Sequence, residues 1–265
     1  MEKHMISGLN QSELKEFLDE KASQYNNPIF IESDPVQIPH LYVLKEDIEI
    51  SAFLAATVAW GNRKSVIRSA MRMMELMGNS PYDFVMSHTA KDLNRMEGFV
   101  HRTFNATDFR TFIVGLQHIY KKYGGMEQLF ATNQSEGYLH NSITEFKKRF
   151  FEVNHQQRTQ KHIADPATNS AAKRIHLFLR WMARKDNSGV DLGIWHSVSP
   201  SILSCPLDVH SGNIARSLGL ITRRQNDGKA LVELDANLRA FDPIDPVKYD
   251  YALFGIGAFE KNILL

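Results

Sequence analysis

The most constraining feature of this sequence is the stretch at residues 46–60, which is apolar on nearly every side when wound as a helix. It contains Ile48, Ile50, Phe53, Leu54 and Val58 together with four alanines. A helix at the surface of a protein keeps a polar face, and this one has none, so we expect it to be central and buried. The pair Gly61-Asn62 follows it in the position of a C-terminal cap. The rest of the chain must therefore build a core around a helix.

Apolar residues recur at helical spacing along most of the chain. The pattern predicts helices over residues 11–25, 46–60, 64–78, 108–123, 138–151, 171–184, 209–218, 229–241 and 248–259. Ser12 and Glu16 indicate the start of the first helix, the two prolines of residues 34–39 predict an extended connector, and the polar residues 156–170 predict a loop. No alternating strand pattern exceeds four or five residues. The sequence thus predicts an all-α fold, with residues 1–265 forming a single domain of two helical lobes with a cleft between them.

Composition excludes several classes of protein. Because Cys205 is the only cysteine, an internal disulfide, a four-cysteine zinc site and an iron–sulfur cluster are all excluded. A reducing compartment suits such a chain, so we expect a cytoplasmic protein. Residues 1–11 contain no apolar run typical of a signal peptide, and no stretch of about 18 apolar residues predicts a membrane span. The net charge of +1 excludes a histone-like nucleic-acid binder but not one that uses a local basic face.

Positive charge is concentrated between residues 161 and 224. Nine Lys and Arg residues face four Asp residues there, and nine minus four gives a local excess of +5. Such a region can dock nucleic-acid phosphates, and the alternative is a solvated helix face. We assign phosphate contacts to Arg174, Arg180 and Arg216 within this region, and to Lys64 after the first buried helix.

Two residues of the same region can carry chemistry. Lys173 lies near the start of the predicted helix 171–184, and a partly desolvated lysine amine is a nucleophile that can form a Schiff base. The alternative is a surface lysine with a buried stem. Asp208 directly precedes the helix 209–218, where a capping carboxylate is rigid and ionised and can stabilise a developing cation. The spacing of His176, His196 and His210 matches no metal site, so we predict no metal and no cofactor.

The residues around Asp208 also carry a family resemblance. Residues 206–210 (PLDVH), followed by residues 213–220, resemble the helix-hairpin-helix DNA glycosylase superfamily, in which a catalytic aspartate stands just before a helix. Lys173 matches the lysine of the bifunctional members, which attacks C1′ of the damaged nucleotide. The long separation between Lys173 and Asp208 is closest to the archaeal 8-oxoguanine glycosylase branch. The glycine-rich hairpin that precedes this lysine in the superfamily is replaced here by residues 168–172 (TNSAA).

A second resemblance covers nearly the whole chain. Residues 49–61, 173–181, 206–210 and 245–255 are similar to a bacterial family of conserved hypothetical proteins. Together the two resemblances imply a helix-hairpin-helix glycosylase fold with its core at about residues 46–260.

The glycosylase resemblance implies an enzyme that excises an oxidised purine, such as 8-oxoguanine, from double-stranded DNA. Lys173 would form the Schiff base and act as an AP lyase, and Asp208 would stabilise the cationic transition state. We expect a monomer. The candidates to contact the flipped base are Trp60, Arg63, Phe178, Trp181, Trp195 and His210, the aromatic ones having a place in the core as their alternative. The alternative functions are a non-catalytic helical nucleic-acid-binding protein and a protein-interaction scaffold.

Overall fold

The apolar run forms helix α2 (Lys45–Thr57) of the computed structural model, which describes residues 9–132, 134 and 137–260. Every residue from 48 to 57 is buried, as expected for a central helix. The ring of Phe53 has four phenylalanine neighbours with centroids 5.5–5.8 Å away: Phe112, Phe146, Phe150 and Phe178. The helix ends at Thr57, earlier than predicted, because the backbone turns over residues 58–60 and reaches a φ of +99° at Gly61.

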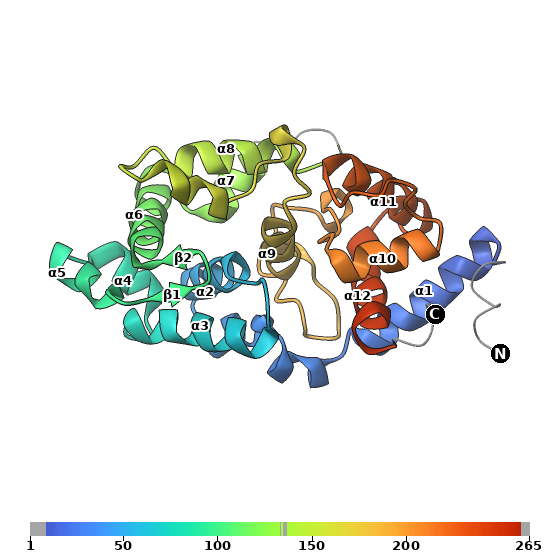
Figure 1. Ribbon diagram of the computed structural model, residues 1–265, viewed down its shortest axis with the longest axis horizontal. Helices are drawn as coiled ribbons and strands as arrows, with labels where there is room; N and C mark the ends of the chain where they lie inside the picture. Colours follow the sequence, from blue (N-terminus) through green and yellow to red (C-terminus); the bar gives the residue numbers. More distant parts are fainter. Residues whose placement is uncertain (1–8, 133, 135–136, 261–265) are drawn as a thin grey trace.

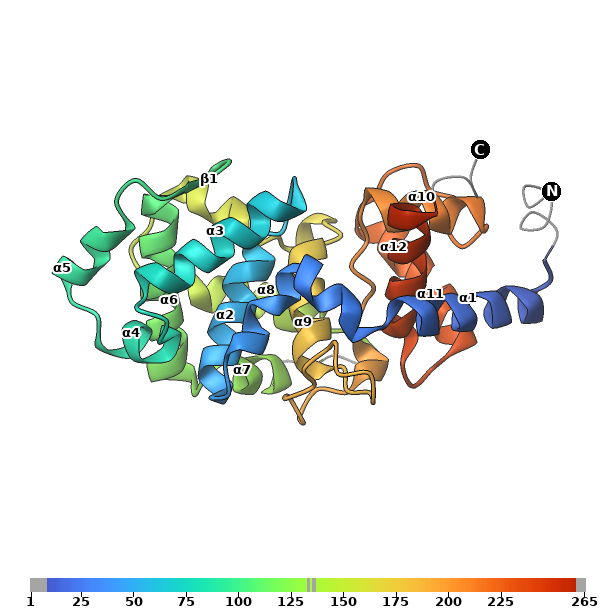
Figure 2. The same cartoon turned by 90° about the horizontal axis from the view of Figure 1, so that it is seen from below.

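Two groups of helices lie on either side of helix α9 (Lys173–Ala183), as Figures 1 and 2 show. The first group holds α2, α3 (Arg63–Leu76), α4 (Pro81–Ser87), α5 (Ala90–Leu93), α6 (Ala106–Tyr123), α7 (Met126–Thr132) and α8 (His140–Phe150). The second holds α10 (Val209–Ser217), α11 (Gly228–Phe241) and α12 (Tyr249–Phe259), with α1 (Gln11–Tyr25) packed along α12. The all-α prediction is confirmed.

The buried residues of both groups belong to one continuous hydrophobic core. Helix α9 contributes to it through one face, which carries Ile175, Phe178, Leu179, Trp181 and Met182. The predicted domain of residues 1–265 also includes 1–8 and 261–265, which lie outside the described residues.

The contact between α1 and α12 depends on a glycine. A β-carbon at Gly255 would lie 2.2 Å from the ring of Tyr25, so only glycine lets the two helices come this close. Near the end of α12, Glu260 accepts hydrogen bonds from Lys21 at 2.7 Å and from the Tyr25 hydroxyl. These contacts fix the N-terminal helix to the second group.

The sequence did not predict the shortest helices and strands of the structure. Helices α4, α5 and α7 were not predicted because each has seven residues or fewer, too few to display a helical period. The hairpin of β1 (Val100–His101) and β2 (Phe104–Asn105), antiparallel with Val100 opposite Asn105, is shorter still. The polar loop of residues 156–170 contains two 3₁₀ helices, Gln157–His162 and Pro166–Thr168.

Two local predictions near the N-terminus were wrong. The connector at residues 34–39 is not extended, because the chain forms 3₁₀ helices at Pro28–Ser33, Pro35–Gln37 and Pro39–Leu41. Each begins with a proline, whose fixed φ suits the first position of a helix. Helix α1 starts from a capping box of Asn10 and Glu13 rather than from Ser12 and Glu16.

Candidate functional site

A cavity of about 320 Å³ lies beside α9, and its lining residues come from both groups of helices. Its walls come from α1, the 3₁₀ turns of residues 28–37, the turn between α2 and α3, α9, the segment before α10, and α12. Helix α9 contributes Lys173, Leu177 and Arg180, whose spacing of four and three residues places them on one helical face. The polar face of α9 therefore forms one wall of the cavity, opposite to the face that enters the core.

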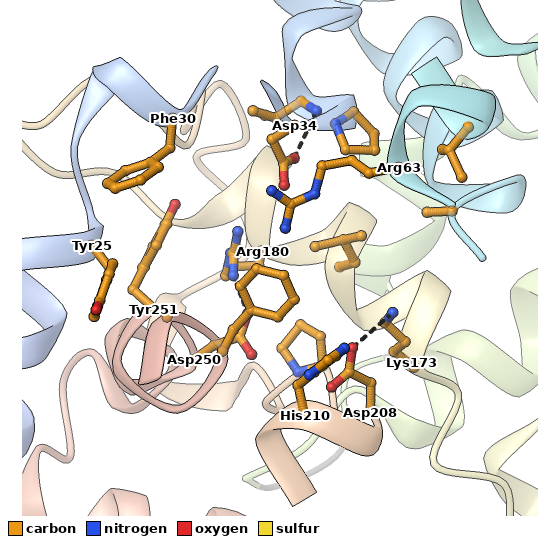
Figure 3. A pocket seen from close by; sticks show the side chains of 18 of the residues that line it. Tyr25, Phe30, Asp34, Arg63, Lys173, Arg180, Asp208, His210, Asp250 and Tyr251 are labelled. Carbon is orange, nitrogen blue, oxygen red and sulfur yellow. Dashed lines mark hydrogen bonds and ion pairs between the residues drawn. The ribbon is translucent and has the colours of Figure 1, made fainter. Parts of the chain in front are cut away.

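The amine of Lys173 and the carboxylate of Asp208 meet on this wall, with Nζ 3.2 Å from Oδ2 (Figure 3). Lys173 is the first residue of α9 and its side chain is 34% exposed, whereas that of Asp208 is 15% exposed. Asp208 is the N-cap of α10, and its Oδ1 accepts a hydrogen bond from the Ser211 N–H at 2.9 Å. Burial raises the pKa of Asp208, but the Lys173 charge and the Ser211 N–H outweigh it and hold this pKa below its usual value. The carboxylate is ionised, rigid and accessible.

A second charged group lies deeper in the cavity around Arg180. Its guanidinium donates to Asp191 at 3.2 Å and to Asp250, and lies 4.3 Å from the ring centroid of Tyr251. Burial raises the pKa of Asp250 to about 6, although Arg180 acts to lower it. The assignment of Arg180 to a DNA phosphate was wrong, since the side chain is buried and neutralised by carboxylates. Arg184 is likewise buried, among Asp186, Asp191 and Asp245.

Asp34 and Arg63 approach the cavity from the opposite side (Figure 3). Burial raises the pKa of Asp34 despite its hydrogen bond from the Val36 N–H. The guanidinium of Arg63 lies over the ring of Phe254, 5.3 Å from its centroid. Sequence reasoning identified Asp208 but missed the other two acids that line the cavity, Asp34 and Asp250. Asp250 lies in residues 245–255, one of the segments that resemble the bacterial family, and this resemblance could have identified it. Nothing in the sequence distinguishes Asp34 from any other aspartate that caps a helix.

Of the aromatic residues predicted to stack on a base, only Trp60 reaches the cavity. Phe178 and Trp181 are fully buried in the core, so that prediction was wrong for both. Trp195 is also buried, and its indole N–H donates to Glu49 at 2.7 Å. The spacing of apolar residues along a helix predicts which side chains are buried. It does not predict whether a buried aromatic side chain packs in the core or lines a cavity.

Trp60 is half-buried and lines the cavity next to Gly61. The guanidinium of Arg174 lies 4.7 Å from its ring centroid and donates to the carbonyl of Thr57. His210 lines the cavity too, is exposed, and donates from Nδ1 to the carbonyl of Gly257 at 3.2 Å.

The other predicted phosphate contacts lie away from the cavity lining. Lys64 is exposed on α3 and faces a different surface hollow. Arg216 donates to the Arg223 carbonyl at 2.8 Å and to the Asn226 side chain, which ties together the end of α10 and the following loop.

The segment that replaces the glycine hairpin keeps an unusual backbone. Asn169 and Ala172 have φ values of +60° and +42°, in the left-handed region that glycine adopts most readily. The carbonyl of Asn169 accepts a hydrogen bond from the Gly228 N–H at 2.8 Å, and its side chain accepts one from the Lys229 N–H at 3.1 Å. The segment immediately before Lys173 is therefore fixed to the start of α11.

Within the described part of the chain, no group of three or more His, Cys, Asp or Glu side chains is arranged to hold a metal ion. His176 lies in the core, and neither of its ring nitrogens has a hydrogen-bond partner among the described residues. No helix in the described ranges is both long and apolar enough to cross a membrane.

The fold and the site define an all-α protein with a lysine–carboxylate pair in a cavity between two groups of helices. The chain belongs to the family described as "Protein of unknown function (DUF2400)", whose model matches residues 34–259. The matched region contains Asp34, Lys173, Asp208 and Asp250, and it leaves out Tyr25 and Phe30 of the cavity wall. No curated protein and no solved structure matches the chain.

Proposed function

We propose that the chain is a DNA glycosylase with AP lyase activity that excises an oxidised purine, such as 8-oxoguanine, from double-stranded DNA. The observation that supports this most is the 3.2 Å contact between Lys173 Nζ and Asp208 Oδ2 on a cavity wall. An amine nucleophile beside a fixed carboxylate is the arrangement that this reaction needs. The two residues are far apart in the sequence, so their proximity is a property of the fold.

The cavity suits a flipped base in size and in lining. Its volume of about 320 Å³ exceeds that of a purine, and Trp60, Tyr251 and Phe254 supply aromatic surface. The cavity is also lined by polar groups, which include the guanidinium of Arg63 and the carboxyl groups of Asp34 and Asp250 (Figure 3). A base that leaves the helix stack loses stacking energy, and aromatic walls with a few polar groups replace part of it.

The reaction would begin when the Lys173 amine, having given a proton to water, attacks C1′ of the flipped nucleotide. The C1′–N bond breaks, and its electron pair leaves with the base, which takes up a proton. Positive charge develops on the sugar during this step, and the Asp208 carboxylate is placed to stabilise it.

The lysine nitrogen then uses its lone pair to expel O4′, which is protonated, leaving an iminium at C1′. Loss of a C2′ proton expels the 3′ phosphate, and water hydrolyses the iminium to free Lys173. The lyase step and the base excision thus share one nucleophile.

Borohydride trapping tests the proposal directly. Duplex DNA with one 8-oxoguanine is incubated with the full chain and sodium borohydride, which reduces the iminium to a stable amine. We expect a covalent adduct with the wild type and none with Lys173→Gln. Lys185→Gln is the matched control, because Lys185 is an exposed lysine just after the same helix and should leave the adduct intact.

Asp208→Asn separates chemistry from folding. Asparagine caps helices as well as aspartate does, so this variant should keep α10 while it loses the charge that faces Lys173. We expect native thermal stability and adduct formation slowed by about 100-fold or more. If wild type binds DNA but forms no adduct with 8-oxoguanine or with an abasic site, the non-catalytic nucleic-acid-binding alternative is favoured instead.

A further inference from the structure

The tip of the β1–β2 hairpin holds an arginine in an unfavourable backbone conformation. Arg102 has a φ of +54°, in the left-handed region where glycine, asparagine and aspartate are the common residues. Arginine has no local advantage in such a turn. Its presence therefore calls for a role of the side chain.

The hairpin is fixed at the edge of the cavity by its neighbour His101. The two ring nitrogens of this buried histidine lie 2.8 Å from Ser69 Oγ and 3.3 Å from the carbonyl of Trp60. Burial lowers the pKa of His101, which keeps the ring neutral. Ser69 belongs to α3 and Trp60 lines the cavity, so the hairpin tip has a defined position beside the turn between α2 and α3.

The guanidinium of Arg102 lies against Gly61 in that turn. A β-carbon built on Gly61 would be 2.7 Å from Arg102 Nη1, so the arginine occupies the space that a side chain would fill. The side chain of Arg102 is exposed and forms no ion pair with any residue in the described ranges. Its charge is therefore available to an external anion.

Two further arginines lie around the same turn. Arg63 stands two residues after Gly61, and Arg174 lies over Trp60, the residue before it. Neither forms an ion pair within the part of the chain that the structure describes, in contrast to Arg180 and Arg184 in their clusters of carboxylates. Three segments of the chain thus bring Arg63, Arg102 and Arg174 together at one edge of the cavity; we call them the arginine surface.

We infer that the arginine surface binds the phosphodiester backbone of double-stranded DNA beside the nucleotide in the cavity, and that Arg102 contacts a phosphate. A planar guanidinium group binds two phosphate oxygens at once, and Arg102 is the member of the three that is exposed and has no ion pair among the described residues. That the anion is DNA rests on the proposed function. The inference keeps Arg174 from the predicted phosphate contacts. It replaces Lys64 and Arg216, which lie away from the cavity lining, and Arg180, which is paired with buried carboxylates, with Arg63 and Arg102.

Binding to undamaged duplex DNA, followed by fluorescence anisotropy over a range of salt concentrations, tests this without any chemistry. Arg102→Asn removes the charge but supplies a residue that favours a positive φ, so the hairpin should keep its fold. We expect about tenfold weaker binding at low salt, and a plot of log affinity against log salt that is shallower by about one. Arg102→Lys should recover most of the affinity and the full slope.

Lys91→Gln is the control for a simple loss of charge, since Lys91 is exposed on α5, and Figure 1 shows α5 at the end of the first group of helices that is remote from α9. It should bind as the wild type does. The inference is overturned if Arg102→Asn, with native thermal stability, shows the affinity and salt slope of the wild type. Tighter binding of duplex RNA than of duplex DNA would also overturn it.

These results are distinguishable from those of the trapping experiment. Normal trapping by a wild type whose binding does not depend on Arg102 would reject the arginine surface alone. Salt-dependent binding that needs Arg102, in a protein that forms no adduct, would reject the glycosylase chemistry alone.

Discussion

Lys173 and Arg180 lie about two turns apart on the same face of helix α9, and both side chains line the same cavity. Their surroundings differ. Lys173 is at the accessible end, paired with a single carboxylate, whereas Arg180 is buried and bonded to both Asp191 and Asp250. Replacing Lys173 should therefore change the stability of the protein little, whereas replacing Arg180 should reduce it strongly.

Lys173→Gln should leave the free energy of unfolding within about 1 kcal/mol of the wild type, because a partly exposed ion pair adds little stability. Arg180→Gln should cost about 3–5 kcal/mol, because it leaves the buried carboxylate of Asp250 without its ion-pair partner and leaves Asp191 paired with Arg184 alone. Urea denaturation monitored by circular dichroism measures both. A large loss of stability in Lys173→Gln would show that this residue has a structural role.

His176 makes the stability of the protein depend on pH. Burial lowers the pKa of this histidine from 6.5 to about 3 in the folded chain. Below pH 6.5 the unfolded chain binds a proton that the folded chain does not, so this contribution to stability is complete above pH 6.5 and is lost as pH falls toward 3.

His176→Leu should remove that dependence, since leucine fills similar space and leaves no buried nitrogen without a partner. Between pH 7 and pH 5 the wild type should lose about 2 kcal/mol more than the variant. Urea denaturation at the two pH values measures the difference. Parallel losses in the two proteins would contradict the assignment.

Gly61→Ala should destabilise the protein for two reasons. A φ of +99° is strained for alanine, at a cost of about 1–3 kcal/mol, and the new methyl group would collide with the Arg102 guanidinium. In an Arg102→Ala background only the backbone cost remains, so a double-mutant cycle should give a coupling of about 0.5–1 kcal/mol. Strict additivity would mean that the Arg102 side chain does not rest on Gly61.

Gly255→Ala should weaken the contact between α1 and α12, because the added methyl group would meet the Tyr25 ring. We expect a cost of about 1–3 kcal/mol from overpacking, measured by thermal and urea unfolding. Gly257→Ala, two residues further along α12, is a milder control, since its nearest neighbour would be His210 at 3.1 Å. Combining Gly255→Ala with Tyr25→Ala should abolish the cost of the glycine change, and an unchanged cost would count against this contact.

The long helices could be predicted from sequence because their apolar spacing repeats over several turns. Gln11–Tyr25 was predicted with its observed ends, and the central position of α2 followed from its lack of a polar face. The 3₁₀ turns at residues 28–41 and the β1–β2 hairpin could not be predicted, because they are held by prolines and single caps rather than by a period.

The candidate site was only partly accessible from sequence. Lys173 and Asp208 were identified through their places at helix starts and through a resemblance, and the structure brings them together. Arg180 was misread because charge in a sequence does not reveal burial. Arg102 was missed because its position beside the cavity depends on a contact with Gly61, which lies about 40 residues earlier in the chain.

The hydrogen bonds from α11 to Asn169 show how Lys173 is held. They tie the start of α9 to the second group of helices, which also carries Asp208. The rest of α9 packs on the first group, where the ring centroids of Phe178 and Phe53 lie 5.5 Å apart and Arg174 donates to the Thr57 carbonyl. The helix that carries the amine therefore joins the two groups, and a change in the packing of either group would alter the alignment of the reacting pair.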